Sequence, residues 1–330
     1  MTQRQCLWFD APYRVSVRDE RIDALAPTQV LVHTSHSAIS AGTELLFYRG
    51  QVPCGLPVDA SIAALSGDAR YPLRYGYACV GRVIEIGAQI THEWRNRLVF
   101  AFQPHASHFT ANIDDVIPIP KNITPEQAAF LPNMETAVNL VMDGAPRIGE
   151  RVVVLGQGIV GLLTTALLAQ MPLAHLLTFD QFALRREKSR VLGATTALDP
   201  SHDAQSMDAD LTFELSGNPD ALNRAIHLTG FEGRIVVGSW YGDKRVPIDL
   251  GSRFHRSRIR LISSQVSTLA AEFSSRWDKA RRIEVAWQML AHIPTRELVT
   301  HRFPLANAAR AYELLDQHPE QAVQVLFEYK

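Results

Sequence analysis

The sequence has few of the features that mark disulfide-rich or zinc-knot proteins. Only three of its 330 residues are cysteine, and Cys6, Cys54 and Cys79 form no Cys-x-x-Cys pair. This argues against a disulfide framework and a structural zinc knot, and it predicts three small buried thiols in a reducing compartment.

Charge of one sign and long apolar runs are also scarce. The 33 Lys and Arg residues nearly balance the 34 Asp and Glu residues, which gives a formal net charge of −1. Without a basic field, we expect neither a nucleic acid nor an anionic membrane as a partner. No window reaches the roughly 20 apolar residues of a membrane span, and the first residues lack the apolar stretch of a signal peptide. We therefore expect a cytoplasmic protein.

Residues 1–121 form a first block that is mostly β with irregular loops. Apolar and β-branched runs predict strands at residues 28–33, 79–86 and 97–102. No helical period is sustained in this block. The pattern changes at Thr124-Pro125-Glu126, which has the N-cap, the N1 proline and the first-turn acid of a helix start.

Residues 122–264 form a second block in which short apolar runs alternate with helical segments. Strands are predicted at 151–155, 176–179, 211–214 and 234–238, and helices at 158–170, 183–192 and 221–228. This alternation predicts a parallel sheet covered by helices on both faces. In the tail, residues 265–330, segments 268–291 and 305–315 look helical and 322–329 looks like a strand. The tail is too short for a domain, so we expect it to pack back on the first block.

One motif in the second block carries chemistry. Residues 151–161 read RVVVLGQGIVG, a Gly-x-Gly-x-x-Gly turn between a predicted strand and a predicted helix. Gly156 permits the tight turn, Gly158 lets a pyrophosphate approach the backbone, and Gly161 allows helix and strand to pack closely. The first helical amides, those of Ile159 and Val160, then face the phosphates. A glycine turn that serves only packing is the alternative.

Asp180 extends the motif to a dinucleotide site. It lies 19 residues past Gly161, at the end of the next predicted strand, where a carboxylate accepts hydrogen bonds from the adenosine ribose. A carboxylate there repels a 2′-phosphate, so NAD is favoured over NADP. Arg185 and Arg186 follow closely and blunt that preference, unless they belong only to a solvated helix face.

The whole chain resembles the medium-chain dehydrogenase/reductase superfamily. The resemblance is carried by residues 85–87, 146–150, 192–194, 214–218 and 233–238. It implies an α/β fold, with a Rossmann doubly wound parallel sheet in 122–264 and a mostly β, GroES-like catalytic domain in 1–121 that is completed by 265–330. It also implies a homodimer joined at the Rossmann sheet edge, to which residues 234–238 contribute. In that family, residues placed like Arg185 lie against the adenosine, and residues placed like Ser216, Gly238 and Ser239 line the cofactor cleft.

The resemblance breaks where zinc-dependent members hold their metal. Their Cys-Gly-Thr-Asp segment reads Ala-Gly-Thr-Glu at 41–44, their Gly-His-Glu segment reads Gly-Tyr-Ala at 76–78, and their third-ligand region reads Leu-Pro-Asn-Met-Glu at 131–135. Only Glu135 there is a plausible ligand, and only with a shifted alignment. Because a catalytic zinc needs about three protein ligands, we expect no metal. A subgroup typified by bacteriochlorophyllide a dehydrogenase is similar at residues 39–44, 75–77, 263–265 and 276–278.

Without zinc, hydrogen-bond donors must stabilise the alkoxide of a hydride transfer. Thr43 matches a hydroxyl that passes a proton in related enzymes, and Tyr77 stands at a former ligand position. Either is the predicted acid/base, with Glu44 beside them. Plainer interpretations stay open: Thr43 caps a helix that begins at Glu44, Tyr77 is a packing aromatic, and Glu44 closes a local hydrogen-bond network. Three histidines are weaker candidates: His255 as a catalyst, and His105 with His108 as metal ligands.

Three functions fit these observations. We expect a zinc-independent, NAD(H)-dependent alcohol dehydrogenase or carbonyl reductase that acts on a small organic alcohol or ketone. A tetrapyrrole hydroxyethyl dehydrogenase is the second function. A non-catalytic NAD-binding redox sensor is the third, although the retained Thr43 weighs against it.

Overall fold

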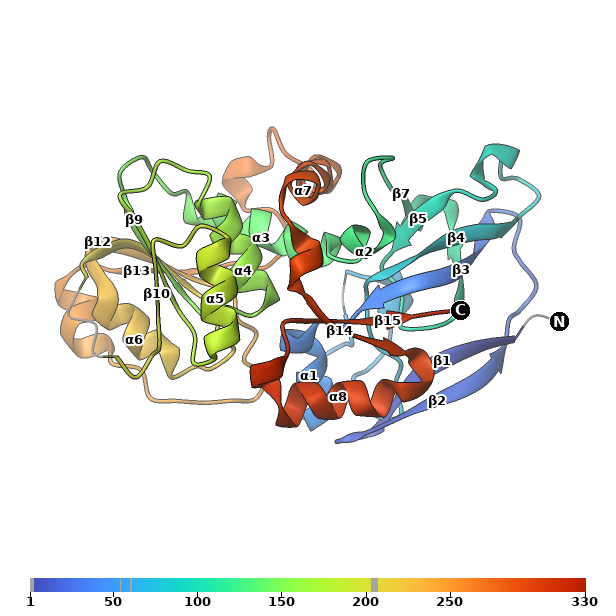
Figure 1. Ribbon diagram of the computed structural model, residues 1–330, viewed down its shortest axis with the longest axis horizontal. Coiled ribbons are helices and arrows are strands. Elements are labelled where there is room, and N and C mark those ends of the chain that lie inside the picture. Colours follow the sequence, from blue (N-terminus) through green and yellow to red (C-terminus); the bar gives the residue numbers. More distant parts are fainter. Residues whose placement is uncertain (1–2, 54, 60, 203–206) are drawn as a thin grey trace. The chain divides into compact units, whose positions relative to one another are not determined.

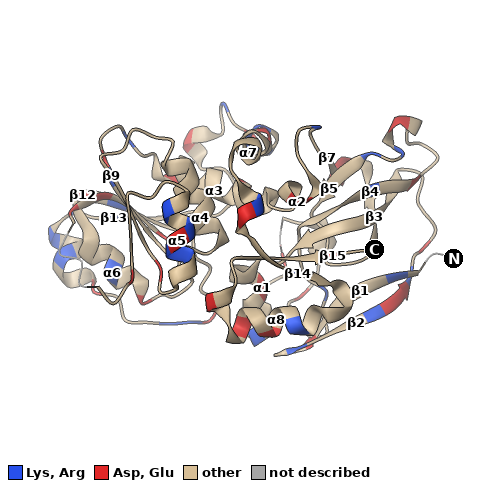
Figure 2. Ribbon diagram, in the orientation of Figure 1, with Lys and Arg blue, Asp and Glu red and all other residues tan. Residues whose placement is uncertain are grey.

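The computed structural model describes residues 3–53, 55–59, 61–202 and 207–330, so Cys54 lies outside the described residues. The chain divides into two compact units, here unit 1 (Met1–Pro132 with Leu290–Lys330) and unit 2 (Asn133–Met289). Both charge signs are interspersed over the elements of each unit (Figure 2). No described helix is long and apolar enough to cross a membrane.

The division differs from the expected boundaries at 121/122 and 264/265. Within unit 1, Glu126 pairs with Arg302 at 2.6 Å. Within unit 2, Arg282 pairs with Glu135 at 2.9 Å. These ion pairs join segments far apart in the sequence, and composition does not reveal them.

Unit 1 is built on a seven-stranded sheet in the order β14-β15-β3-β4-β5-β7, with β6 also paired to β3 (Figure 1). Its strands are β3 (Gln29–Ala38), β4 (Cys79–Ile86), β5 (Leu98–Ala101), β6 (His108–Asn112), β7 (Val116–Pro118), β14 (Val299–Pro304) and β15 (Gln324–Glu328). The strands predicted at 28–33, 79–86, 97–102 and 322–329 are confirmed. A separate hairpin, β1 (Gln3–Ala11) with β2 (Arg14–Arg21), was not predicted, because β2 is mostly polar and partly exposed.

Helices in unit 1 are few, and one of them was missed. They are α1 (Ala41–Arg49), α2 (Pro125–Ala128) and α8 (Ala308–Gln317). The first block was expected to sustain no helical period, with a helix from Glu44 left open; α1 instead begins at Ala41, buries Phe47 and Tyr48 and stacks the Tyr48 ring on Tyr312 of α8. Thr124 caps α2 through a reciprocal capping box with Gln127, as predicted from the sequence.

Unit 2 has six parallel strands in the order β10-β9-β8-β11-β12-β13. The strands are β8 (Arg151–Leu155), β9 (His175–Phe179), β10 (Thr196–Leu198), β11 (Ala209–Glu214), β12 (Thr229–Val237) and β13 (Arg260–Ser263). The helices are α3 (Leu131–Gly144), α4 (Ile159–Leu168), α5 (Ala183–Val191), α6 (Ala221–Leu228) and α7 (Lys279–His292). This is the doubly wound dinucleotide-binding order, and it confirms the predicted fold class.

The sheet of unit 2 is buried on both faces. Val153 and Leu155 of β8 join one core with Ile226 of α6. Val152 and Val154 belong to the other core, which includes residues of α3 and α4. The chain order reverses between β8 and β11, and ligands of such sheets bind outside the carboxyl ends of the strands at that point.

Two predictions about unit 2 are wrong. Residues 234–238 cannot form a free sheet edge, because β12 pairs with β11 on one side and with β13 on the other. The predicted helix over 268–291 begins only at Lys279. The carbonyls of Val266 and Thr268 accept hydrogen bonds from Arg282 instead of from helical amides.

Candidate functional site

Two glycines of the motif are fixed by the backbone of unit 2 itself. Gly156 has a φ of +90°, and a Cβ there would lie 2.5 Å from Cα of Ser216. A Cβ on Gly161 would lie 2.0 Å from the carbonyl oxygen of Gly156. Both positions therefore need glycine for folding, whether or not a ligand binds.

Gly158 is different, because the protein does not need a glycine there. Its φ is −65° and a Cβ would meet nothing within 4 Å. It precedes Ile159, the first residue of the ten-residue helix α4, and no side chain caps this helix start. Open space in front of the uncapped amides of Ile159 and Val160 fits the pyrophosphate of a dinucleotide.

Asp180 follows β9 and is buried. Its Oδ2 accepts the amide of Gln157 at 2.7 Å, and its Oδ1 accepts the amide of Phe182 at 2.8 Å. The carboxylate thus ties the glycine turn to the start of α5. A carboxylate oxygen has more than one acceptor site, so Asp180 keeps capacity for ribose hydroxyls.

Arg185 and Arg186 of α5 contact different groups. Arg185 lies over the Phe182 ring, with its Nη1 4.0 Å from Asp180. Burial lowers the pKa of Arg185, and the Asp180 charge opposes this shift. Arg186 donates to Asp199 at 2.8 Å and to the carbonyl of Asp180. Its charge is therefore engaged within the unit.

A buried carboxylate that sequence reasoning missed organises the loops after β11 and β12. Glu214 ends β11 beside Leu155 of β8 and accepts the amide of Ser216 at 2.8 Å and the hydroxyls of Ser216 and Tyr241. Burial and this carboxylate raise the pKa of Tyr241. A charged residue at the carboxyl end of a predicted buried strand is the sequence feature that points to Glu214.

The remaining predicted cofactor residues lie in these same loops. The Ser239 hydroxyl accepts the amide of Gly217 at 2.9 Å, which links the loop after β12 to the loop after β11. A Cβ on Gly238 would lie 2.6 Å from the side chains of Leu140 and Leu215. Gly238 is thus explained by packing, whereas Ser216 and Ser239 are brought together at the strand ends.

In unit 1, the predicted acid/base residues meet at the start of α1. The Tyr77 hydroxyl donates to Oγ of Ser40 and lies 3.3 Å from Oγ1 of Thr43. Burial raises the pKa of Tyr77 to about 12, against hydrogen bonds to Ser40 and Thr43 that lower it. Tyr77 is therefore protonated at neutral pH and its hydroxyl has polar partners. Sequence reasoning missed Ser40.

Thr43 does not cap a helix. Because α1 begins at Ala41 with Ser40 at the N-cap, Thr43 lies within its first turn. The interpretation of Thr43 as the cap of a helix beginning at Glu44 is therefore wrong, and its hydroxyl is near Tyr77 instead.

Glu44 lies in a buried hydrogen-bond network. Its Oε1 accepts the Ser40 amide at 2.7 Å, and its Oε2 lies 3.1 Å from Nε2 of His105 and accepts the Tyr312 hydroxyl. Glu44 and His105 are both fully buried, and Nδ1 of His105 lies 2.6 Å from Oγ of Ser37. These contacts match the interpretation in which Glu44 closes a local hydrogen-bond network. Through the Ser40 amide, Glu44 also positions Ser40.

The weaker histidine candidates are not brought together. His105 bonds to Glu44, whereas the His108 ring packs against His33 at 4.7 Å between centroids. His255 follows the short turn at 250–254 and is exposed.

The positions that align with the zinc ligands of zinc-dependent dehydrogenases, called here the former zinc positions, are Ala41, Tyr77 and the segment 131–135, and their side chains include no thiolate and no imidazole. Ala41 has no donor atom, Tyr77 bonds to Ser40, and Glu135 is paired with Arg282 inside unit 2. Within the described part of the chain, one group of three possible ligands occurs, and it lies elsewhere: His36, Glu126 and Glu328. Arg302 already pairs with both of its carboxylates, at 2.6 and 3.5 Å. The donor set at the former zinc positions does not fit zinc, which prefers nitrogen and sulfur ligands.

Comparison with known proteins shows similarity over the whole chain. No family model matches. The chain is 23% identical over 330 residues to D-guloside 3-dehydrogenase of Escherichia coli K12, which covers 92% of this chain and 93% of that protein. The structure of Escherichia coli L-idonate 5-dehydrogenase superposes with a TM-score of 0.80 over 99% of both chains at 17% identity. That of an Escherichia coli alcohol dehydrogenase complexed with NADH gives 0.79 over 100% of both chains at 18% identity. With the strand order of unit 2, these similarities show that the chain has the two-domain fold of these dehydrogenases and resembles one of them in sequence over nearly its full length.

Proposed function

We propose that this protein is an NAD(H)-dependent alcohol dehydrogenase or carbonyl reductase that works without a catalytic zinc. The observation that carries the proposal is the hydroxyl cluster of Tyr77, Ser40 and Thr43, in which Tyr77 occupies a position that the family resemblance assigns to a zinc ligand. Full-length similarity to a guloside dehydrogenase favours a polyhydroxylated substrate.

The cofactor proposal rests on unit 2. Gly158, Ile159 and Val160 hold the pyrophosphate, because an uncapped helix start with open space in front of it attracts phosphate. Asp180 holds the ribose and favours NAD. Arg186 is paired with Asp199, so its charge contributes little to attracting a 2′-phosphate. Arg185 packs against the adenosine, and Ser216 and Ser239 line the nicotinamide side.

The reduction needs a hydride and a proton. Bound NADH supplies the hydride to the carbonyl carbon. Tyr77 is protonated at neutral pH and donates its proton to the carbonyl oxygen. The Ser40 and Thr43 hydroxyls then turn to stabilise the phenolate. Glu44 does not touch the substrate in this scheme, and it positions Ser40 through the Ser40 amide.

Replacing Tyr77 by Phe tests the acid/base role. We expect kcat for NADH-dependent carbonyl reduction to fall by roughly 10²-fold, because a positioned general acid contributes about that much. Tyr75→Phe is the matched control, since Tyr75 packs edge-on against Tyr77 and belongs to the same core. Full turnover by a folded Tyr77→Phe protein would remove Tyr77 from the mechanism.

Metal analysis tests the absence of zinc. Protein that has been dialysed against a chelator should keep its activity and contain well under one zinc per chain. One tightly held zinc per active chain would contradict the proposal. If the protein binds NADH but reduces none of a panel of carbonyl compounds that includes tetrapyrroles, the redox-sensor hypothesis would be favoured. Turnover of tetrapyrroles alone would favour the pigment enzyme.

The proposal includes a cytoplasmic homodimer. Among the described strands, β10 and β13 are the two edges of this sheet. We assign β13 rather than β12 to the dimer interface, and Leu261 on β13 is 47% exposed. Measuring the mass in solution by light scattering tests the dimer, and a monomer at working concentration would contradict it.

A further inference from the structure

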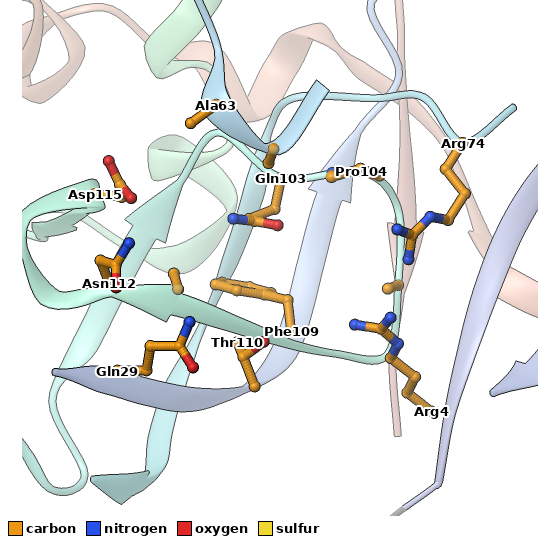
Figure 3. A pocket seen from close by; sticks show the side chains of 13 residues that line it. Arg4, Gln29, Ala63, Arg74, Gln103, Pro104, Phe109, Thr110, Asn112 and Asp115 are labelled. Carbon is orange, nitrogen blue, oxygen red and sulfur yellow. The ribbon is translucent and has the colours of Figure 1, made fainter. Parts of the chain in front are cut away.

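Unit 1 contains a polar pocket of about 300 Å³ that shares no residue with the Tyr77 cluster (Figure 3). It is lined by β1, β6, the loop at 103–106 and Arg74. Figure 3 shows the guanidinium groups of Arg4 and Arg74 pointing toward one another on one side of the pocket. Asn112 and Asp115 lie on the opposite side, with the Phe109 ring between the two sides.

Positive charge is in excess on the arginine side. Arg4 and Arg74 share one carboxylate, with nitrogens 3.0 and 3.4 Å from Oε2 of Glu20. Oε1 of Glu20 accepts the Trp8 indole at 2.7 Å. Burial raises the pKa of Glu20, but hydrogen bonds from Trp8 and Arg4 outweigh it, so the net pKa is lowered. Glu20 therefore stays ionised, and two cations face one anion.

Arg4 also has a donor without a partner. Its Nε is buried and makes no hydrogen bond. An unpaired buried donor on a charged group is destabilising. An oxyanion beside the Arg4 and Arg74 guanidinium groups would compensate the excess charge on this side of the pocket. The planar guanidinium favours carboxylate or phosphate over halide.

The rest of the lining selects among oxyanions. Gln103, Thr110 and Asn112 line the pocket and offer amide and hydroxyl groups of both polarities. The Phe109 ring supplies an apolar wall. Asp115, on the side away from the arginines, disfavours a second negative charge there. These groups fit an anion with one charged end and a chain of hydroxyl-bearing carbons.

We propose that this pocket binds a small carboxylate that bears several hydroxyl groups, with the carboxylate held by Arg4 and Arg74. This site is independent of the proposed dehydrogenase chemistry, and it would give the protein a second ligand of sugar-acid type.

Calorimetry with the full chain and without cofactor tests the site. D-gluconate should bind more tightly than sorbitol, which lacks the carboxylate, and any sorbitol binding at the proposed catalytic site should be equal in wild type and Arg74→Gln. Arg74→Gln should weaken gluconate binding by at least about tenfold, since it removes a charge-assisted contact. Arg70→Gln is the matched control, because Arg70 is 85% exposed and 3.7 Å from Asp68.

The outcomes separate the alternatives. Gluconate binding that is lost in Arg74→Gln and kept in Arg70→Gln supports the proposal. The absence of gluconate binding overturns the proposal. Equal gluconate affinity in wild type and Arg74→Gln also overturns it, because gluconate would then bind elsewhere. Binding of inorganic phosphate but not of gluconate also overturns it. An unchanged NADH titration shows that Arg74→Gln is folded. Because no turnover is measured, failure here leaves the dehydrogenase proposal untouched.

Discussion

Tyr77 is a phenol surrounded by hydroxyl groups, and this environment sets its protonation. Burial raises its pKa to about 12, above the ordinary value of 10. A group with a raised folded-state pKa favours folding as long as it is protonated. Its contribution is fully present below the unfolded pKa and is lost as the pH rises through the folded pKa.

The free energy of unfolding should therefore fall between pH 10 and pH 12 in a way that depends on Tyr77. The size is about 1 kcal/mol at pH 11, from the conversion of pKa difference into free energy. Urea unfolding of wild type and Tyr77→Phe at pH 9 and pH 11 measures it. Parallel losses in both proteins would show that Tyr77 is not the titrating group.

Glu44 is the second residue whose replacement is informative. Glu44→Ala leaves the Ser40 amide, His105 and the Tyr312 hydroxyl without their acceptor. We expect the free energy of unfolding to fall by about 3 kcal/mol or more, since each unsatisfied buried donor costs about 1–3 kcal/mol.

Chemical denaturation of Glu44→Ala against Glu284→Ala measures this loss, because Glu284 is exposed on a helix. Similar stability of the two variants would mean that the network adds nothing.

At the scale of elements, the turn between β8 and α4 separates folding from binding. Gly161 is required by the backbone, whereas Gly158 borders open space. The same substitution at these two positions should therefore affect different properties of the protein.

Gly158→Ala should lower the free energy of unfolding by less than about 1 kcal/mol, the usual size of an N-cap change. It should nevertheless weaken NADH binding by about tenfold or more, because the added methyl group fills the space proposed for the phosphate. Gly161→Ala should cost about 1–3 kcal/mol through overpacking. Thermal unfolding and fluorescence titration with NADH measure both effects. Unchanged NADH affinity in Gly158→Ala would argue against the phosphate site.

At the scale of the whole molecule, unit 1 and unit 2 each have a sheet and a core of their own. A ligand that binds only the native form of one unit stabilises that unit by mass action. Cofactor binding should therefore be visible as a local gain in stability.

NADH at about 100 times its Kd should stabilise unit 2 by about 2.7 kcal/mol, and NADPH at the same concentration by less. Native-state hydrogen exchange at the amides of β8 and α4 measures this gain. If NADH slowed hydrogen exchange only at amides of the unit 1 sheet, the result would contradict a cofactor site in unit 2. Equal or greater stabilisation by NADPH would contradict the NAD preference.

Local pattern was enough for much of the fold. The strands at 79–86 and 151–155, the capped start of α2 and the glycine turn depend on residues within a few positions of one another. Side-chain period, caps and glycine geometry act over that distance, so the sequence could predict them. The resemblance of the whole chain to medium-chain dehydrogenases allowed the Rossmann and GroES-like architecture to be predicted as well.

The glycine turn could be predicted from local sequence, because its strand, glycines and helix are contiguous and Gly156 and Gly161 each have a local steric reason. The partners of Tyr77 and Glu44, and the approach of Arg4 and Arg74 to Glu20, depend on long-range packing of the chain. Tyr312 is 268 residues from Glu44, and Arg74 is 54 residues from Glu20. Buried polar groups take whichever partner the packed chain brings near, and no local pattern specifies that partner.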